Sequence, residues 1–233
     1  MLTLDKALSG EIMEIEGTSF KRLKNKQRSI RDNFPENVGL RVHRAISWLQ
    51  RAEMESNDYD AAFMFYWVSF NAAYAGDQEE YSLAGERSIF SDYFEKMISL
   101  DPHHKIYNAI WEKFSASIRL LLNNKYVFQP FWKYHNQVQG YEDWEERFEK
   151  SKSRIKAAMG TRDTRLILTI LFDRLYVLRN QLIHGGATWN SQVNRSQVQD
   201  GEKILAFLMP IFIGLMMDNP DADWGAPSYP VIE

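Results

Sequence analysis

The sequence predicts an all-α protein folded as a helical bundle. Apolar residues recur at helical spacing between residues that typically start and stop helices, and no segment alternates polar and apolar residues long enough to form a sheet. Of the 233 residues, 45% are hydrophobic and 14% are aromatic, which is enough to bury a substantial core. We expect one domain over residues 33–218, an N-terminal arm or peripheral helix at 1–32, and a proline-containing C-terminal tail at 219–233.

The first part of this domain is expected to contain two long helices. Residues 38–54 have apolar side chains at helical spacing. Residues 59–75 follow a helix cap at Asn57 or Asp58 and end before Gly76. Aromatic residues occupy nearly every side of this second helix, so we expect it to be central and buried. They are Phe63, Phe65, Tyr66, Trp67, Phe70 and Tyr74.

The middle of the chain predicts three further helices and one irregular segment. Residues 86–100 and 141–159 have amphipathic patterns, and residues 101–122 begin with an aspartate and a proline that typically open a helix. Residues 125–139 are less regular and rich in aromatic side chains. These side chains either fix a long connection onto the core or stack on nucleic-acid bases.

Two long helices are expected to complete the domain. Residues 161–184 form an apolar helix with Thr161 as its cap, and Asn194 with Gln197 resembles a capping box for the last helix. The most apolar run, 204–217, contains a proline and is shorter than the roughly 20 residues that span a membrane. We therefore expect a buried helix there.

The composition excludes several classes of function. The chain has no cysteine, which excludes disulfides, thiolate metal sites and cysteine nucleophiles and fits a cytoplasmic location. It lacks the His-Glu-x-x-His and Glu-x-x-His metal motifs and the glycine-rich loops that bind nucleotide phosphates. The net charge of −3 argues against nucleic-acid binding through global charge, and the N-terminus lacks the apolar run of a signal peptide. We expect no metal, no cofactor and no association with a membrane.

The end of the 161–184 helix combines an arginine, a carboxamide and an imidazole in Arg179, Asn180 and His184. A ribonuclease that uses no metal must take a proton from a ribose 2′-hydroxyl, protonate the leaving oxygen and neutralise charge at phosphorus. Histidine titrates near neutrality, and arginine holds phosphate oxygens bidentately. The three residues are therefore candidate catalytic residues. The alternative is that His184 only ends the helix before Gly185, where a positive charge favours the helix dipole.

The spacing of these residues bears on how they meet. At roughly 100° per residue, Asp173, Asn180 and His184 share one face of the helix, whereas Arg179 lies about 140° from His184. Arg179 therefore reaches the histidine through its long side chain or meets it across a symmetric partner. A polar stripe on so apolar a helix also requires a partner, a cleft or a dimer interface. We take Asp173 as a supporting residue and expect a homodimer.

Arg179-Asn180, three further residues and His184 resemble the arginine, polar residue, spacer and histidine signature of the HEPN family (higher eukaryotes and prokaryotes nucleotide-binding domain). The resemblance covers roughly residues 38–76 and 161–217, and it implies a HEPN-like helical bundle with extra helices inserted at about 101–160. It also implies RNA cleavage without metal by a homodimer. Among the branches of the family, the chain looks most like the larger ones associated with phage defence and abortive infection.

Four further residues are candidates for the RNA site. Arg41, Arg44 and Arg51 lie along one face of the 38–54 helix and are candidate contacts to the RNA backbone; the alternative is an ordinary solvated face. Asn71 is a polar exception on the aromatic helix. It either faces the catalytic cleft, as polar residues of the corresponding helix do in the family, or satisfies a neighbouring backbone group.

These observations predict a metal-independent endoribonuclease whose products carry a 2′,3′-cyclic phosphate and a 5′-hydroxyl. Its partners would be RNA, a second copy of the chain and, in a toxin or phage-defence role, an antitoxin or other defence-system protein. The alternative is a catalytically silent bundle that binds a partner protein or nucleic acid.

Overall fold

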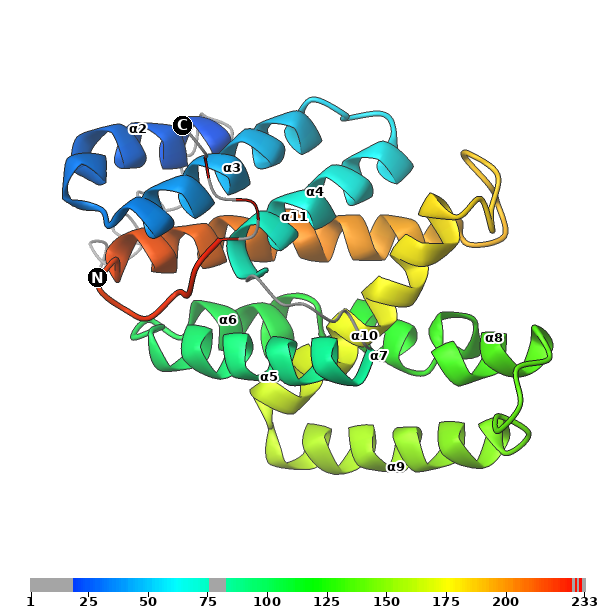
Figure 1. Ribbon diagram of the computed structural model, residues 1–233. Coiled ribbons are helices and arrows are strands. Elements are labelled where there is room, and N and C mark those ends of the chain that lie inside the picture. Colours follow the sequence, from blue (N-terminus) through cyan, green and yellow to red (C-terminus); the bar gives the residue numbers. More distant parts are fainter. Residues whose placement is uncertain (1–18, 76–82, 228, 230, 232–233) are drawn as a thin grey trace, which may run out of the picture.

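The structure is a computed structural model, and it describes residues 19–75, 83–227, 229 and 231. It confirms the all-α bundle: the described residues form ten α-helices and no β-strand (Figure 1). The helices are α2 (Ser19–Ile30), α3 (Glu36–Glu53), α4 (Tyr59–Tyr74), α5 (Leu83–Ser99), α6 (Lys105–Asn108), α7 (Ser115–Leu122), α8 (Gln129–His135), α9 (Trp144–Thr161), α10 (Thr164–Ile183) and α11 (Arg195–Asp218).

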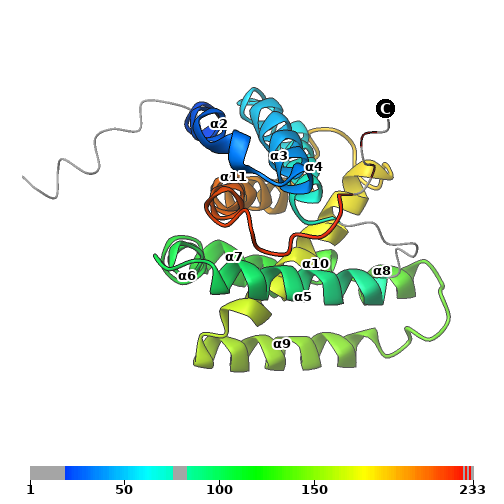
Figure 2. The same cartoon turned by 60° about the vertical axis from the view of Figure 1, so that its left-hand side comes forward.

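The helices form two groups joined by α10. Helices α3, α4 and α11 pack against one another, and α2 packs on α3 and α11. Helix α10 contacts both α4 and α5 and crosses the bundle obliquely (Figure 1). Helix α9 packs on α8 and α10 and lies on the side of the bundle opposite α2 and α3 (Figure 2). The motif helix α10 therefore contacts α4 on one side and α5 and α9 on the other.

An aromatic cluster fills the junction of α4, α5, α10 and α11. The Phe70 ring centroid lies 4.5 Å from that of Phe172, and Phe94 lies 4.7 Å from Phe172. Phe70, Phe94 and Phe172 are fully buried, as is Phe212 of α11. The prediction that the aromatic helix and the motif helix are central is confirmed. Ring burial of this extent is the dominant stabilising contribution to such a core.

The prediction of one helix over residues 101–122 is wrong, because the segment is divided into a turn, helix α6, a π-helical turn and helix α7. Asp101 does not cap a helix that begins at Pro102. Its Oδ2 instead accepts a hydrogen bond from the backbone N–H of Ile106 at 2.7 Å, and His104 adopts a left-handed conformation with φ +52°. Helix α6 starts only after this turn, and a π-helical turn at Ala109–Lys113 separates it from α7. Proline followed by two histidines therefore forms a turn here, stabilised by the buried aspartate.

The predicted caps give a mixed result. Asp58 caps α4 as expected, its Oδ1 accepting from the Ala61 N–H at 3.0 Å, whereas Gly76 lies outside the described residues. Thr161 does not cap α10, because it belongs to the last turn of α9. Asp163 takes that role and accepts from the Leu166 N–H at 2.9 Å. Arg162 ends α9 in a left-handed conformation with φ +53°, and α10 begins after it.

The start of α11 also differs from the prediction. Asn194 stands at the position before the helix, but its side chain makes no capping hydrogen bond. The predicted capping box with Gln197 is therefore wrong. The start of α11 is held instead by an ion pair between Arg195 and Asp60, which lies at the start of α4.

The aromatic residues of 125–139 pack mainly on one another. The Phe131 ring lies 5.4 Å from Tyr126, 5.1 Å from Trp132 and 5.0 Å from Trp144. Phe131 is buried, whereas Tyr126 remains more than half exposed. These contacts fix α8 onto α9, which favours the structural interpretation of the cluster.

Candidate functional site

The chain turns sharply at the end of α10, where the motif residues lie. His184 is the C-cap, and its N–H donates to the Asn180 carbonyl at 3.1 Å. Gly185 follows with φ +68°, a conformation that favours glycine, and the Gly186 N–H donates to the Gln181 carbonyl at 2.7 Å. The His184 side chain is exposed to solvent at this turn.

Arg179 donates a hydrogen bond to the neutral side chain of Asn180, and its Nε has no partner among the described residues. Its Nη1 donates to Oδ1 of Asn180 at 2.9 Å, and the guanidinium lies 6.0 Å from the Tyr176 ring centroid. Its Nε is buried and has no hydrogen-bond partner, and no carboxylate pairs with it in the described part of the chain. An arginine in this state retains an uncompensated charge, which favours binding of an anion.

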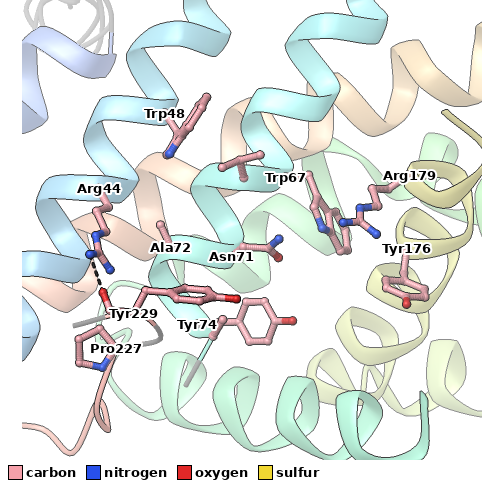
Figure 3. A pocket seen from close by; sticks show the side chains of 12 residues that line it. Arg44, Trp48, Trp67, Asn71, Ala72, Tyr74, Tyr176, Arg179, Pro227 and Tyr229 are labelled. Atoms are coloured by element: carbon pink, nitrogen blue, oxygen red, sulfur yellow. Dashed lines mark hydrogen bonds between the residues drawn. The ribbon is translucent and has the colours of Figure 1, made fainter. Parts of the chain in front are cut away.

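Arg179 faces a cavity of about 630 Å³ between α3, α4 and α10. Figure 3 shows Asn71 of α4 and Arg179 of α10 on the wall of the same space. The structure therefore brings Asn71, a predicted site residue, to the cavity of the motif arginine. The other lining residues are Arg44, Trp48, Trp67, Val68, Ala72, Tyr74, Ala75, Tyr176, Pro227 and Tyr229.

Asn180 connects the arginine to the histidine. It bonds the Arg179 guanidinium through its side chain and lies one helical turn before His184. His184 is not among the residues that line the cavity. Within one chain, Arg179 and His184 are therefore linked through Asn180 and lie on different sides of the helix, as the spacing predicts.

The prediction that Arg41 contacts RNA is wrong, because its side chain is buried in the core. Only 1% of it is exposed, and its guanidinium donates to three carbonyl oxygens: those of Ala73 at 3.2 Å, Ala75 at 2.7 Å and Ala226 at 2.6 Å. Burial lowers the pKa of Arg41 from its ordinary value. Its donors fasten the C-terminal tail to the end of α4, so no phosphate reaches them.

The other two arginines of α3 have separate surroundings. Arg44 lines the cavity, and its Nη2 donates to the Tyr229 carbonyl at 2.7 Å. Arg51 forms an ion pair with Glu55 and lies 4.8 Å from the Phe65 ring centroid. The expected single row of RNA contacts is therefore replaced by one buried, one cavity-lining and one surface arginine. Helical spacing did not reveal this, because the covering element is the distant C-terminal tail.

Asp173 is not part of this cavity. It lines a second hollow, of about 320 Å³, between α9 and α10. The structure therefore does not bring Asp173 to the cavity that Arg179 faces, and its supporting role stays a prediction. The inserted helix α9 covers the part of the polar stripe that contains Asp173 and leaves the part near His184 open.

In comparisons with protein-family models, with curated proteins and with solved structures, the chain has no match. Within the described ranges, no three side chains of histidine, aspartate or glutamate gather where they would hold a metal ion. No helix in the part of the chain that the structure describes is both long and apolar enough to cross a membrane.

Proposed function

We propose that this chain is a metal-independent endoribonuclease of the HEPN type. The observation that carries the proposal is the Arg179 guanidinium, which meets no carboxylate in the described residues and faces a cavity with Asn71. One helical turn beyond its partner Asn180 stands the exposed imidazole of His184. The pattern supplies a phosphate-binding group, an orienting carboxamide and a proton-transfer group at one helix end.

The reaction would proceed by attack of a ribose 2′-hydroxyl on the adjacent phosphorus. A base accepts the 2′-hydroxyl proton while the new P–O bond forms, and an acid protonates the 5′-oxygen as its P–O bond breaks. The products carry a 2′,3′-cyclic phosphate and a 5′-hydroxyl. His184 acts as one of these groups, and Arg179 stabilises the charge on the phosphoryl oxygens.

A homodimer would supply the second proton-transfer group and bring Arg179 of one copy towards His184 of the other. Exposed apolar residues next to the motif support such an interface. Ile183 is 50% exposed, Trp189 75% and Val193 92%. The loop that holds Trp189 is fixed, since its Nε1 donates to Asp58 at 2.8 Å. A fixed apolar surface next to the site is typical of a protein interface.

The cavity also fits a single-stranded substrate. Trp48, Tyr74 and Tyr176 line it, and aromatic rings stack on unpaired bases. We include in the proposal a toxin or phage-defence role in the cytoplasm, with an antitoxin or defence-system protein as a further partner. That part rests on the resemblance of the motif alone.

The proposal is tested with purified protein and a labelled single-stranded RNA in excess EDTA. We expect cleavage to persist, to give 2′,3′-cyclic phosphate ends by mass spectrometry, and to stop when the nucleotide at the cut carries a 2′-deoxyribose. Cleavage that requires a divalent ion contradicts the mechanism. Absence of cleavage across a panel of RNAs, together with tight binding, supports the silent binding bundle instead.

A further inference from the structure

The hollow between α9 and α10 has a strongly positive lining. Arg147, Lys150 and Arg154 contribute from α9 and Arg174 from α10, and only Asp173 is negative. Phe128, Ser151 and Ile170 complete the lining. Since the whole chain has a net charge of −3, this concentration of positive charge is a local feature.

Arg174 gives the hollow a fixed positive charge on the α10 side. It is only 3% exposed, and its Nη2 donates to the Ser151 hydroxyl at 2.9 Å. Its guanidinium lies 4.6 Å from the Phe128 ring centroid. An arginine held in this way loses little side-chain entropy when an anion binds beside it.

The three cations of α9 lie along one face of that helix and are accessible. Their spacing of three and four residues places them in a row. Arg147 pairs with Asp143 and Lys150 with Glu146, each at 2.7 Å. Such exposed pairs at a spacing of four residues contribute little stability in water, so an anion competes with them easily. Arg154 has no ion pair with any described residue.

The hollow lies along the same face of α10 as His184. Asp173, on its wall, precedes His184 by 11 positions, which corresponds to a rise of about 16 Å and a rotation of only about 20°. Between them, Gln181 Nε2 donates to the Tyr126 carbonyl at 2.6 Å, which attaches the segment before α8 to this face. A strand bound at His184 reaches the hollow when it runs along α10 past this segment, whose Phe128 lines the hollow.

We propose that this hollow binds a backbone phosphate of the RNA strand at a distance from the cut. The inference rests on the proposed function, because it takes His184 as the cleavage point. A stacked strand rises about 3.4 Å per nucleotide, so about five stacked nucleotides cover the distance. The forked donors of Arg154 match phosphate oxygens and Lys150 adds a second cation, whereas Arg147 donates to Asp143 and to the Gly140 carbonyl; Asp173 reduces the positive charge without cancelling it. The inserted helix α9 would thus select for longer single strands.

The test measures binding apart from cleavage. A fluorescent 2′-O-methyl octanucleotide, which has no free 2′-hydroxyl to attack, is titrated with wild type and with the Lys150→Gln, Arg154→Gln double variant. We expect the variant to bind about tenfold more weakly, with a salt dependence reduced by about 0.7 per lost contact. The matched control, Lys156→Gln with Lys203→Gln, removes the same charge from exposed positions outside the hollow and should bind within about twofold of wild type.

A dinucleotide substrate, which is too short to reach the hollow from His184, should be cleaved equally by both double variants. Equal loss of octanucleotide affinity in the two double variants, or no loss in either, overturns the proposal. Binding of inorganic phosphate in the hollow, with octanucleotide affinity unchanged in the Lys150→Gln, Arg154→Gln variant, also overturns the proposal. Octanucleotide binding that depends on the hollow, without cleavage of any RNA, would refute the ribonuclease and leave the phosphate site standing. Normal RNA cleavage, together with unchanged octanucleotide affinity in the Lys150→Gln, Arg154→Gln variant, would refute the phosphate site and leave the ribonuclease standing.

Discussion

Arg41 is buried and Arg179 is half-buried, and the comparison shows how partners decide the role of an arginine. Arg41 has three carbonyl acceptors that join α4 to the C-terminal tail. Arg179 has one neutral acceptor, Asn180, and a cavity in front of it. The first arginine satisfies the backbone of its own chain and belongs to the fold. The second retains donors for a ligand and is the better candidate for chemistry.

The largest effect is expected at Arg179. Arg179→Ala should lower RNA cleavage by about 10²–10³-fold, because it removes the charge that stabilises the transition state. The melting temperature should change little, since among the described residues Arg179 makes one side-chain hydrogen bond, to Asn180, and lies 6.0 Å from the Tyr176 ring centroid. Single-turnover cleavage with a thermal melt measures both quantities. A large loss of stability in Arg179→Ala, with normal cleavage by the protein that remains folded, would show that Arg179 has a structural role like that of Arg41.

Arg41→Met should have the opposite profile. It leaves the carbonyls of Ala73, Ala75 and Ala226 without their donor, and we expect a loss of about 3 kcal/mol in the free energy of unfolding, measured with urea. Cleavage per folded molecule should remain near wild type. The control is Arg51→Met on the same helix, which removes the ion pair with Glu55 just beyond the end of α3; its loss should cost at most about 1 kcal/mol. Equal costs for the two variants would contradict the account of Arg41.

Smaller effects are expected from the carboxamides. Asn180→Ala should lower cleavage about tenfold, because Asn180 orients Arg179 with a hydrogen bond worth about 1 kcal/mol and takes no proton itself. Asn71→Ala should weaken RNA binding more than it slows the chemical step, since Asn71 lines the cavity away from His184. Separate measurement of KM and kcat distinguishes the two. An effect of Asn180→Ala as large as that of Arg179→Ala would give the carboxamide a direct part in the reaction.

The sequence was sufficient where a local pattern decides the structure. The aromatic sides of α4, the apolar length of α10 and the glycine after His184 all depend on residues close together in the chain, and these features are as predicted. The sequence did not predict the features that depend on contacts between segments far apart in the chain. The carbonyls that bury Arg41 come from the tail and from the end of α4, and Asp173 faces an inserted helix. Helix spacing gives a side of a helix, but it does not say which element covers that side.

The most direct test of the central claim is the rate of RNA cleavage by His184→Ala, measured beside His103→Ala. Both histidines are exposed, and His103 lies in the turn before α6, away from the motif. We predict that His184→Ala lowers the single-turnover rate by about 10²–10⁴-fold while the fold and RNA binding persist, and that His103→Ala cleaves like wild type. Cleavage by His184→Ala at the wild-type rate would contradict the assignment of proton transfer to the end of α10.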